Sequence, residues 1–277
     1  MIAYVNHVFL KEEKATLQVS DLAIQRGYAT FDFFRIKDNC PLFLDDYLDR
    51  FYRSADFMHL HPVKSKEEVK EIIRELMEMN KLAESGMRLI LTGGYSSDHY
   101  EPVSGNLLIL QEKLQLPSQE KFATGVKVIT YEYQRELPQI KSINYFMGIW
   151  LQQKLREQKA ADVIYHKQGI VSELPRANIL MVTKDQKILT PSKNILFGIT
   201  RMKLLELAAK KYIVEEREVT ISELINAEEV FMTSTTKRIL PINQIDNFVI
   251  GNGKSGPVTA LLNEEFIKIE DDYKSKR

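Results

Sequence analysis

The stretch LPQIKSINYF, residues 137–146, carries one lysine, Lys141, directly after Ile140 and before Ser-Ile-Asn-Tyr. An ammonium group that loses hydration among apolar neighbours becomes easier to deprotonate, and its amine then attacks carbonyl compounds. A lysine at the end of a strand more often buries only its stem and keeps its charge in water. The stretch alone therefore leaves a nucleophile and an ordinary surface lysine both open.

Other motifs contain groups that a phosphorylated carbonyl cofactor requires. GIVSELPRANILMV places Glu173 and Arg176 between two apolar strands. GITR, residues 198–201, places backbone amides and a hydroxyl at the start of a helix, where anions bind. STTK, residues 234–237, ends an apolar strand with three hydroxyls, and Arg50 lies on a helix with an apolar face. A lysine, a carboxylate and a phosphate site together are the parts of a pyridoxal phosphate site.

Four motifs give the chain a resemblance to the class IV, fold type IV aminotransferases over nearly its whole length. KSINY matches the lysine motif of that family, Lys-x-x-Asn-Tyr, and ELPRAN matches its Glu-x-x-x-x-Asn segment. GITR is matched outright, and DRFYRSA, residues 49–55, matches a helix of the first lobe. Each motif is weak by itself, but all four occur in the order and spacing of the family.

The resemblance implies two α+β domains with the cofactor in the cleft between them, a homodimer, and a role for each matched residue. Lys141 is implied to form the Schiff base with pyridoxal 5′-phosphate and to carry the proton, and Glu173 to pair with the pyridine nitrogen. Tyr145 is implied to bind the 3-hydroxyl of the cofactor, and Phe31 to line the substrate pocket. The phosphate is implied to be bound by Arg50, the amides of Ile199 and Thr200, Ser234 and Thr235.

The group that binds the substrate carboxylate is not evident from the sequence. In the family's D-alanine transaminases an Arg-x-His pair follows a strand of the first lobe, whereas this chain reads TGGYSSDHYEP, without arginine. STTK likewise replaces the Gly-Thr-Ala-Ala of the branched-chain enzymes. A buried carboxylate still needs a cation or several donors. The basic residues inside or beside matched motifs are Arg26, Arg88, Arg176 and Lys237, each of which could equally form a surface ion pair.

The combined pattern is similar to a less typical branch of D-amino-acid transaminases. We therefore expect transfer of the amino group of a D-amino acid, such as D-alanine or D-glutamate, to a 2-oxo acid by a ping-pong mechanism. Branched-chain L-amino-acid transfer and aminodeoxychorismate lyase activity are the alternatives on the same scaffold. A binding protein without chemistry is a further alternative, which the intact lysine, glutamate and phosphate motifs disfavour.

These residues must be positioned by two lobes of strands and helices. Hydrophobic periodicity predicts a first α+β domain over residues 1–112, a linker over 113–124 and a larger α+β domain over 125–277 that carries Lys141. At the start, residues 4–10 and 15–21 are predicted to form a hairpin separated by the charged residues 11–14. A capping box at Ser65 and Glu68 predicts the start of a helix.

Composition narrows the class of protein further. The 277 residues contain 38 Lys and Arg and 38 Asp and Glu, a balance that disfavours nucleic acid and anionic membranes as partners. No apolar run is long enough to span a bilayer, so we expect a cytoplasmic protein. The single cysteine, Cys40, excludes an internal disulfide, and the five scattered histidines give no metal-binding spacing. Small-molecule amino acids and 2-oxo acids are the expected partners.

Overall fold

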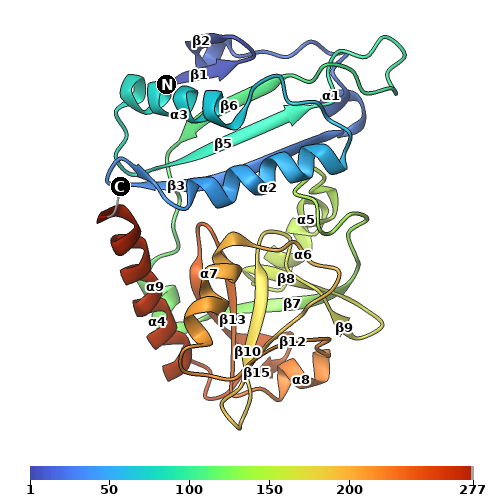
Figure 1. Ribbon diagram of the computed structural model, residues 1–277. Coiled ribbons are helices and arrows are strands. Elements are labelled where there is room, and N and C mark those ends of the chain that lie inside the picture. The colour runs from blue at the N-terminus through green and yellow to red at the C-terminus, as the bar shows by residue number, and fades with distance from the viewer. Residues whose placement is uncertain (276–277) are drawn as a thin grey trace. The chain divides into compact units, whose positions relative to one another are not determined.

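The computed structural model describes residues 1–275, which form two compact units (Figure 1). Unit 1 comprises Met1–Gln115, the short segment Ile140–Asn144 and the chain from Asp272 on. Unit 2 comprises Leu116–Gln139 and Tyr145–Asp271. Each unit combines helices with a sheet, so the expected α+β class is confirmed. The segment that contains Lys141 lies within the expected second domain by sequence, yet its contacts group it with unit 1.

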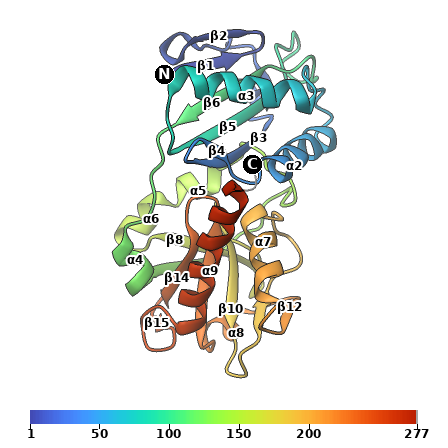
Figure 2. The same cartoon turned by 60° about the vertical axis from the view of Figure 1, so that its left-hand side comes forward.

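Unit 1 is built on a six-stranded antiparallel sheet in the order β2-β1-β6-β5-β3-β4. Its strands are β1 (Ile2–Val5), β2 (Val8–Lys11), β3 (Ala29–Lys37), β4 (Cys40–Pro41), β5 (Ser85–Thr92) and β6 (Leu107–Glu112). Its helices are the 3-10 helix η1 (Glu12–Lys14), α1 (Leu22–Arg26), α2 (Leu44–Phe57) and α3 (Lys66–Asn80). Helix α3 packs on β1 and β6, and α2 packs on β3 (Figure 2).

The helices of unit 1 follow from their sequence patterns. Helix α2 buries Leu48, Phe51 and Ala55, which are spaced to fall on one face. Helix α3 begins with the predicted capping box, because Ser65 accepts a hydrogen bond from Glu68 N–H and the carboxylate of Glu68 accepts one from Ser65 N–H. Both predictions are therefore confirmed.

The first hairpin differs from the expectation. Strands β1 and β2 pair through Val5 and Val8, so the turn lies at Asn6 and not in the charged residues 11–14, most of which form η1. Asn6 has a φ of 57°, a left-handed conformation that asparagine tolerates better than most residues. The predicted boundary was wrong because the turn chemistry of asparagine outweighs the run of charges.

Unit 2 is built on a nine-stranded mixed sheet in the order β12-β11-β10-β13-β14-β7-β8-β9, with β15 paired to β14. The strands are β7 (Val126–Glu132), β8 (Asp162–Lys167), β9 (Ile170–Val171), β10 (Asn178–Val182), β11 (Ile188–Thr190), β12 (Val214–Glu216), β13 (Glu229–Ser234), β14 (Arg238–Ile245) and β15 (Phe248–Val249). The helices are α4 (Gln119–Thr124), α5 (Phe146–Trp150), α6 (Gln152–Glu157), α7 (Ile199–Ala208), α8 (Ile221–Ile225) and α9 (Pro257–Ser275).

Most strand pairs of unit 2 are antiparallel, and several of them are hairpins of strands consecutive in sequence. The parallel pairs are β14 with β7, β7 with β8, and β11 with β12. The core contains apolar side chains from these strands, including Val128, Ile164, Ile179, Met232 and Ile242. This core fixes the strand ends from which the candidate site residues of unit 2 project.

Two general properties of residues 1–275 bear on function. None of their helices has the length and apolar composition that crossing a membrane requires. They also contain no group of three or more His, Cys, Asp or Glu side chains that could hold a metal ion.

Candidate active site

The main chain of Lys141 is hydrogen-bonded to the first residues of β3 in unit 1. Its carbonyl oxygen accepts hydrogen bonds from Phe31 N–H at 2.9 Å and from the hydroxyl of Thr30 at 3.1 Å. Two residues on, Ile143 N–H donates to the carbonyl of Ala29 at 3.0 Å. The lysine segment thus extends the edge of the sheet next to β3, although more than 100 residues separate the two in sequence.

The side chain of Lys141 lies over an aromatic ring that it shares with a second cation. Lys141 Nζ is 4.5 Å from the centroid of the Phe31 ring, and Cζ of Arg88 is 5.6 Å from the same centroid. Arg88 also lies over Phe33, at 5.1 Å. Because a ring face attracts cations, the ring of Phe31 stabilises both Lys141 and Arg88.

Arg88 is also paired with a carboxylate. Its Nε and Nη2 bind the two carboxylate oxygens of Glu112 on β6, the second contact at 3.1 Å. About a third of each side chain is exposed, so the pair is partly solvated. Gly86 makes room for this arrangement, since a Cβ there would lie 2.1 Å from Cζ of Phe33. The same sheet face therefore carries a carboxylate, a guanidinium, two rings and an ammonium.

Arg50, which the resemblance assigns to the phosphate, forms a buried ion pair in unit 1. Its Nε lies 2.9 Å from Oδ2 of Asp32, and its Nη2 lies 2.6 Å from Oδ1. The side chains are 7% and 1% exposed, respectively. This bidentate contact fixes the guanidinium in one orientation.

Glu173 is buried in unit 2 and surrounded by donors. Its Oε1 accepts from Nε of Arg135 at 2.8 Å and lies 2.7 Å from Nη2 of the same residue. Its Oε2 accepts from the backbone N–H of Leu196 at 2.8 Å. Only 4% of Glu173 is exposed, and a buried carboxylate of this kind is stable as an anion only with such partners.

The Glu-x-x-x-x-Asn motif has a direct structural explanation. Asn178 donates from Nδ2 to the carbonyl of Leu196 at 2.7 Å, while Glu173 accepts from the N–H of that residue. An antiparallel bridge between Leu174 and Ala177 brings the flanking residues Glu173 and Asn178 close to each other. Glu173 and Asn178 thus bind both sides of one residue, Leu196, just before helix α7.

Leu196 lies two residues before Gly198, where helix α7 begins as the GITR motif predicts. Gly198 is the N-cap of α7, and a Cβ there would lie 2.2 Å from Oδ1 of Asn178. With no side chain at the cap, the first N–H groups of a ten-residue helix face outward, which is how helices bind anions. Arg201, 4% exposed, anchors the first turn by donating to the carbonyl of Pro191 at 2.9 Å.

The end of β13 lies beside this helix start. Thr233 is the register partner of Asn178, so their side chains point to the same face of the sheet. The hydroxyl of Thr233 is buried and has no hydrogen-bond partner within residues 1–275. A bare helix N-terminus beside an unsatisfied hydroxyl, with Ser234 and Thr235 next in sequence, fits a phosphate group.

The remaining predicted residues are dispersed. Tyr145 is the N-cap of α5 in unit 2, next to the lysine segment in sequence. Arg26 ends α1 and Arg176 lies in the turn before β10, and both are exposed. Lys237 Nζ lies 3.1 Å from Oδ2 of Asp162. The roles assigned to these residues stay predictions.

Sequence reasoning missed several partners of the predicted residues. Arg135, Asp32 and Asp162 each bind a residue of the candidate site, at positions that no motif singled out. Arg135 precedes Lys141 by six residues in QRELPQIK, and a charged residue so close to a candidate lysine is the one available signal. The others could be identified only from contacts.

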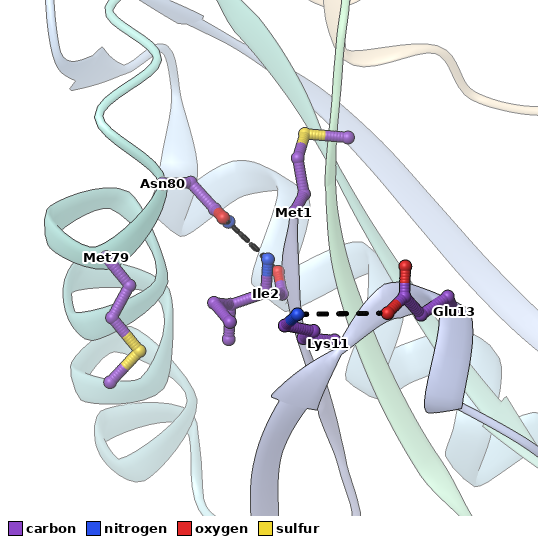
Figure 3. A pocket seen from close by; sticks show the side chains of 6 residues that line it. All are labelled: Met1, Ile2, Lys11, Glu13, Met79 and Asn80. Carbon is purple, nitrogen blue, oxygen red and sulfur yellow. Dashed lines mark hydrogen bonds and ion pairs between the residues drawn. The ribbon is translucent and has the colours of Figure 1, made fainter.

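A separate hollow of about 380 Å³ lies in unit 1 near the start of the chain (Figure 3). It is lined by Met1, Ile2, Lys11, Glu13, Met79 and Asn80. Asn80 binds the main chain of Ile2 there, and Lys11 pairs with Glu13 at 3.9 Å. None of the candidate site residues lines this hollow, so it is separate from the candidate active site.

Comparison with known proteins identifies the family of this chain. The family model described as amino-transferase class IV matches residues 29–245. A D-alanine aminotransferase of Bacillus licheniformis is 31% identical over 260 residues, which cover 92% of both chains. Branched-chain-amino-acid aminotransferase-like protein 1 of Arabidopsis thaliana is 33% identical over 286 residues, which cover 98% of this chain and 51% of that protein.

Among solved structures, the fold is similar to that of the branched-chain amino acid aminotransferase of Escherichia coli. The TM-score is 0.91, with 23% identity, and the match covers 97% of this chain and 94% of the other. A second branched-chain amino acid aminotransferase, whose structure was solved with pyridoxamine 5′-phosphate, matches with a TM-score of 0.90 and 24% identity over 97% of this chain and 93% of the other. At this identity the likeness concerns the fold, and it confirms the expected fold type IV architecture.

Proposed function

The chain belongs to the class IV aminotransferase family, whose members use pyridoxal phosphate, and on that premise we propose that it transfers the amino group of a D-amino acid to a 2-oxo acid. The observation that carries the proposal is the arrangement in unit 2, where Glu173 and the N-terminus of α7 are fixed through the single residue Leu196. A buried carboxylate and an anion site held by the same short segment are suited to the two ends of one cofactor.

The residues of the matched motifs would hold the cofactor. In unit 2, Glu173 would bind the ring nitrogen, and the amides of Ile199 and Thr200 with Ser234 and Thr235 would bind the phosphate. The unsatisfied hydroxyl of Thr233 and the bare cap at Gly198 support the phosphate site. Arg50 would add a cation to the phosphate, Tyr145 would bind the 3-hydroxyl, and Lys141 would bind the aldehyde carbon.

When bound, pyridoxal 5′-phosphate supplies a carbonyl that accepts the amino group and a ring that withdraws electrons from the substrate α-carbon. Lys141 Nζ would act first as the base that takes the proton from the substrate α-carbon and then as the acid that gives this proton up again. Glu173, held in place by Arg135, would pair with the protonated ring nitrogen and so support the electron withdrawal. Donor and acceptor would occupy the site in turn.

Arg88 is the basic residue that we assign to a substrate carboxylate. It lies over the same Phe31 ring as Lys141, so a substrate held at the lysine has a guanidinium nearby. Arg26 and Arg176 are exposed, and Lys237 is paired with the buried Asp162. An incoming carboxylate would compete with Glu112 for Arg88. Glu112 would therefore weaken the binding of acidic substrates.

The preference for D-amino acids is supported by relatives named D-alanine aminotransferase, which match nearly the full length of this chain. Relatives named as branched-chain aminotransferases or aminotransferase-like proteins make branched-chain L-amino acids the second candidate. The two activities use the same lysine and differ in which face of the substrate α-carbon meets it.

The test is a panel of half-reactions with the purified, cofactor-loaded protein. D-alanine, D-glutamate, L-leucine, L-valine and L-isoleucine are added one at a time, and the change in visible absorption of the cofactor is followed together with release of the 2-oxo acid. We expect rapid change with the D-amino acids and slow change with the L-amino acids. The reverse order would establish the branched-chain alternative and refute the D-specific proposal.

We also propose that the protein is a homodimer. Phe146, Ile149 and Trp150 on α5 are 69%, 70% and 59% exposed, and large apolar groups clustered in this way are usually covered by a partner. Light scattering after size exclusion is expected to give twice the chain mass, and Ile149→Glu is expected to shift the protein toward the monomer. A monomer at all concentrations would contradict the proposal.

A further inference from the structure

The turn between β13 and β14 ends with Lys237, and Arg238 follows as the first residue of β14; both basic residues bind acids on other elements of unit 2. Lys237 donates from Nζ to Oδ2 of Asp162, the first residue of β8, at 3.1 Å. Arg238 donates from Nε to Oε2 of Glu270 on α9 at 3.0 Å, and its Nη2 lies 2.8 Å from the same oxygen. Helix α9 and strand β14 run close to each other in Figure 2.

Both acids are nearly inaccessible to solvent. The side chains of Asp162 and Glu270 are 6% and 3% exposed, whereas those of Lys237 and Arg238 are 16% and 19% exposed. A carboxylate buried to this degree requires a cation or several donors, unlike one at the surface. The two basic residues are therefore held firmly, in contrast to surface ion pairs, which contribute little.

The turn itself adopts a conformation that needs support. Ser234 Oγ accepts a hydrogen bond from the N–H of Lys237 at 3.3 Å, which closes the turn. Arg238 has a φ of 49°, in the left-handed region that residues with a Cβ rarely adopt. Its bond to Glu270 lies at the residue where the backbone is strained, so the ion pair stabilises this conformation.

This turn carries the hydroxyls that we assign to the phosphate. Thr233 and Asn178 are register partners, and Asn178 lies against Gly198 at the start of α7. Ser234 and Thr235 follow Thr233, so the position of the turn decides whether their hydroxyls reach an anion at the helix start. A displacement of about 1 Å is enough to weaken such contacts severely.

Building on the proposed function, we propose that Asp162 and Glu270 are positioning residues of the phosphate site. Through Lys237 and Arg238 they hold the β13–β14 turn in the conformation that presents Ser234 and Thr235 to the phosphate before the cofactor arrives. Preorganisation of this kind avoids the entropy cost of ordering the turn on binding. It also gives Lys237 a role in cofactor binding in place of one in substrate binding.

The experiment compares two ligands that differ only in the phosphate. The protein freed of cofactor is titrated with pyridoxal 5′-phosphate and with pyridoxal, and both dissociation constants are measured by absorption and by quenching of the fluorescence of Trp150. For Asp162→Asn and Glu270→Gln we expect the preference for the phosphorylated ligand to fall about tenfold, the loss of one charge-assisted contact. Pyridoxal binding should change less than about twofold, because it does not use the turn.

Glu229→Gln is the matched control. Glu229 is also a buried acid of unit 2, and it accepts from the N–H groups of Val258 and Thr259 at the start of α9. Its loss should lower the melting temperature and leave the ratio of the two dissociation constants unchanged. Asp162→Glu should restore the preference partly, which a general loss of stability would not do.

The outcomes separate this inference from the proposed function. A wild-type protein that binds neither ligand would refute the proposed function and the inference with it. A wild-type protein that prefers the phosphorylated ligand, with the same preference in Asp162→Asn and Glu270→Gln, would refute the inference alone. If Asp162→Asn does not fold, the double variant D162N/K237M removes both charges, leaves no buried ion unpaired and is subject to the same criterion.

Discussion

The segment around Lys141 in unit 1 and the segment around Glu173 in unit 2 hold their side chains in different ways. The main chain of Lys141 is bonded to β3, while its ammonium lies over the ring of Phe31. Glu173 is held at its carboxylate by a guanidinium and a backbone N–H. The Lys141 segment is thus fixed to the sheet through its main chain, and the Glu173 segment is fixed through its carboxylate. The difference is consistent with the proposed roles, in which Lys141 would move a proton and Glu173 would stay in place.

Replacement of Lys141 by Ala should have the largest effect, because the stretch LPQIKSINYF contains no second amine that could take over the proton transfer. We expect the rate of amino transfer to fall about a thousandfold or more, measured in single turnovers with a good amino donor. Lys154→Ala is the control, since Lys154 Nζ also lies over a ring, that of Tyr131 at 5.1 Å, outside the candidate site. A rate within about threefold of wild type for Lys141→Ala would remove the lysine from the mechanism.

Replacement of Arg135 by Gln tests whether Glu173 depends on its ion pair. The side chains are 14% and 5% exposed, so the change leaves a buried carboxylate without its cation. We expect the free energy of unfolding in urea to fall by about 3 kcal/mol or more. Lys187→Gln, which removes a pair with Glu215 whose side chains are 37% exposed, should cost less than about 1 kcal/mol. Equal costs would mean that Glu173 does not need Arg135.

Replacement of Arg88 and of Glu112 tests the sheet face next to Lys141. Arg88→Gln should raise KM for amino acids and 2-oxo acids about tenfold, with a smaller change in kcat, because a carboxylate loses its cation. Glu112→Gln removes the competing carboxylate and should lower KM for dicarboxylic substrates. Steady-state kinetics with alanine and glutamate of the preferred configuration measure both. Identical shifts in the two variants would show a purely structural pair.

Replacement of Tyr165 by Phe should have the smallest effect, which appears only at high pH. Burial raises the pKa of Tyr165, on β8 of unit 2, above the ordinary value of 10.0. Its neutral form favours the folded state, so this contribution is complete below pH 10.0 and is lost as the pH rises further. At about pH 11 the melting temperature of Tyr165→Phe should be about 2 °C higher than that of the wild type. Calorimetry that shows the same alkaline loss in both would contradict this.

The sequence predicted most of the local structure of both regions because the signals are local. The capping box at Ser65 and the apolar face of the helix that carries Arg50 each depend on residues only a few positions apart. The hairpin at Asn6 was misplaced because charge and turn chemistry gave opposite predictions there. Lys141 was expected in the second lobe, since nothing in its own segment indicates that its hydrogen bonds go to β3, more than 100 residues earlier.

The sequence by itself determined the α+β class, the family, and a lysine, a carboxylate and a helix N-terminus as the chemical groups, because residue types and short spacings carry that information. Only the tertiary structure decided which acidic residue forms an ion pair with which basic residue. The pairs Arg135 with Glu173, Asp162 with Lys237 and Glu270 with Arg238 join residues that are between 32 and 75 positions apart. Burial makes each pair necessary, and burial is a property of the folded chain that no local stretch contains.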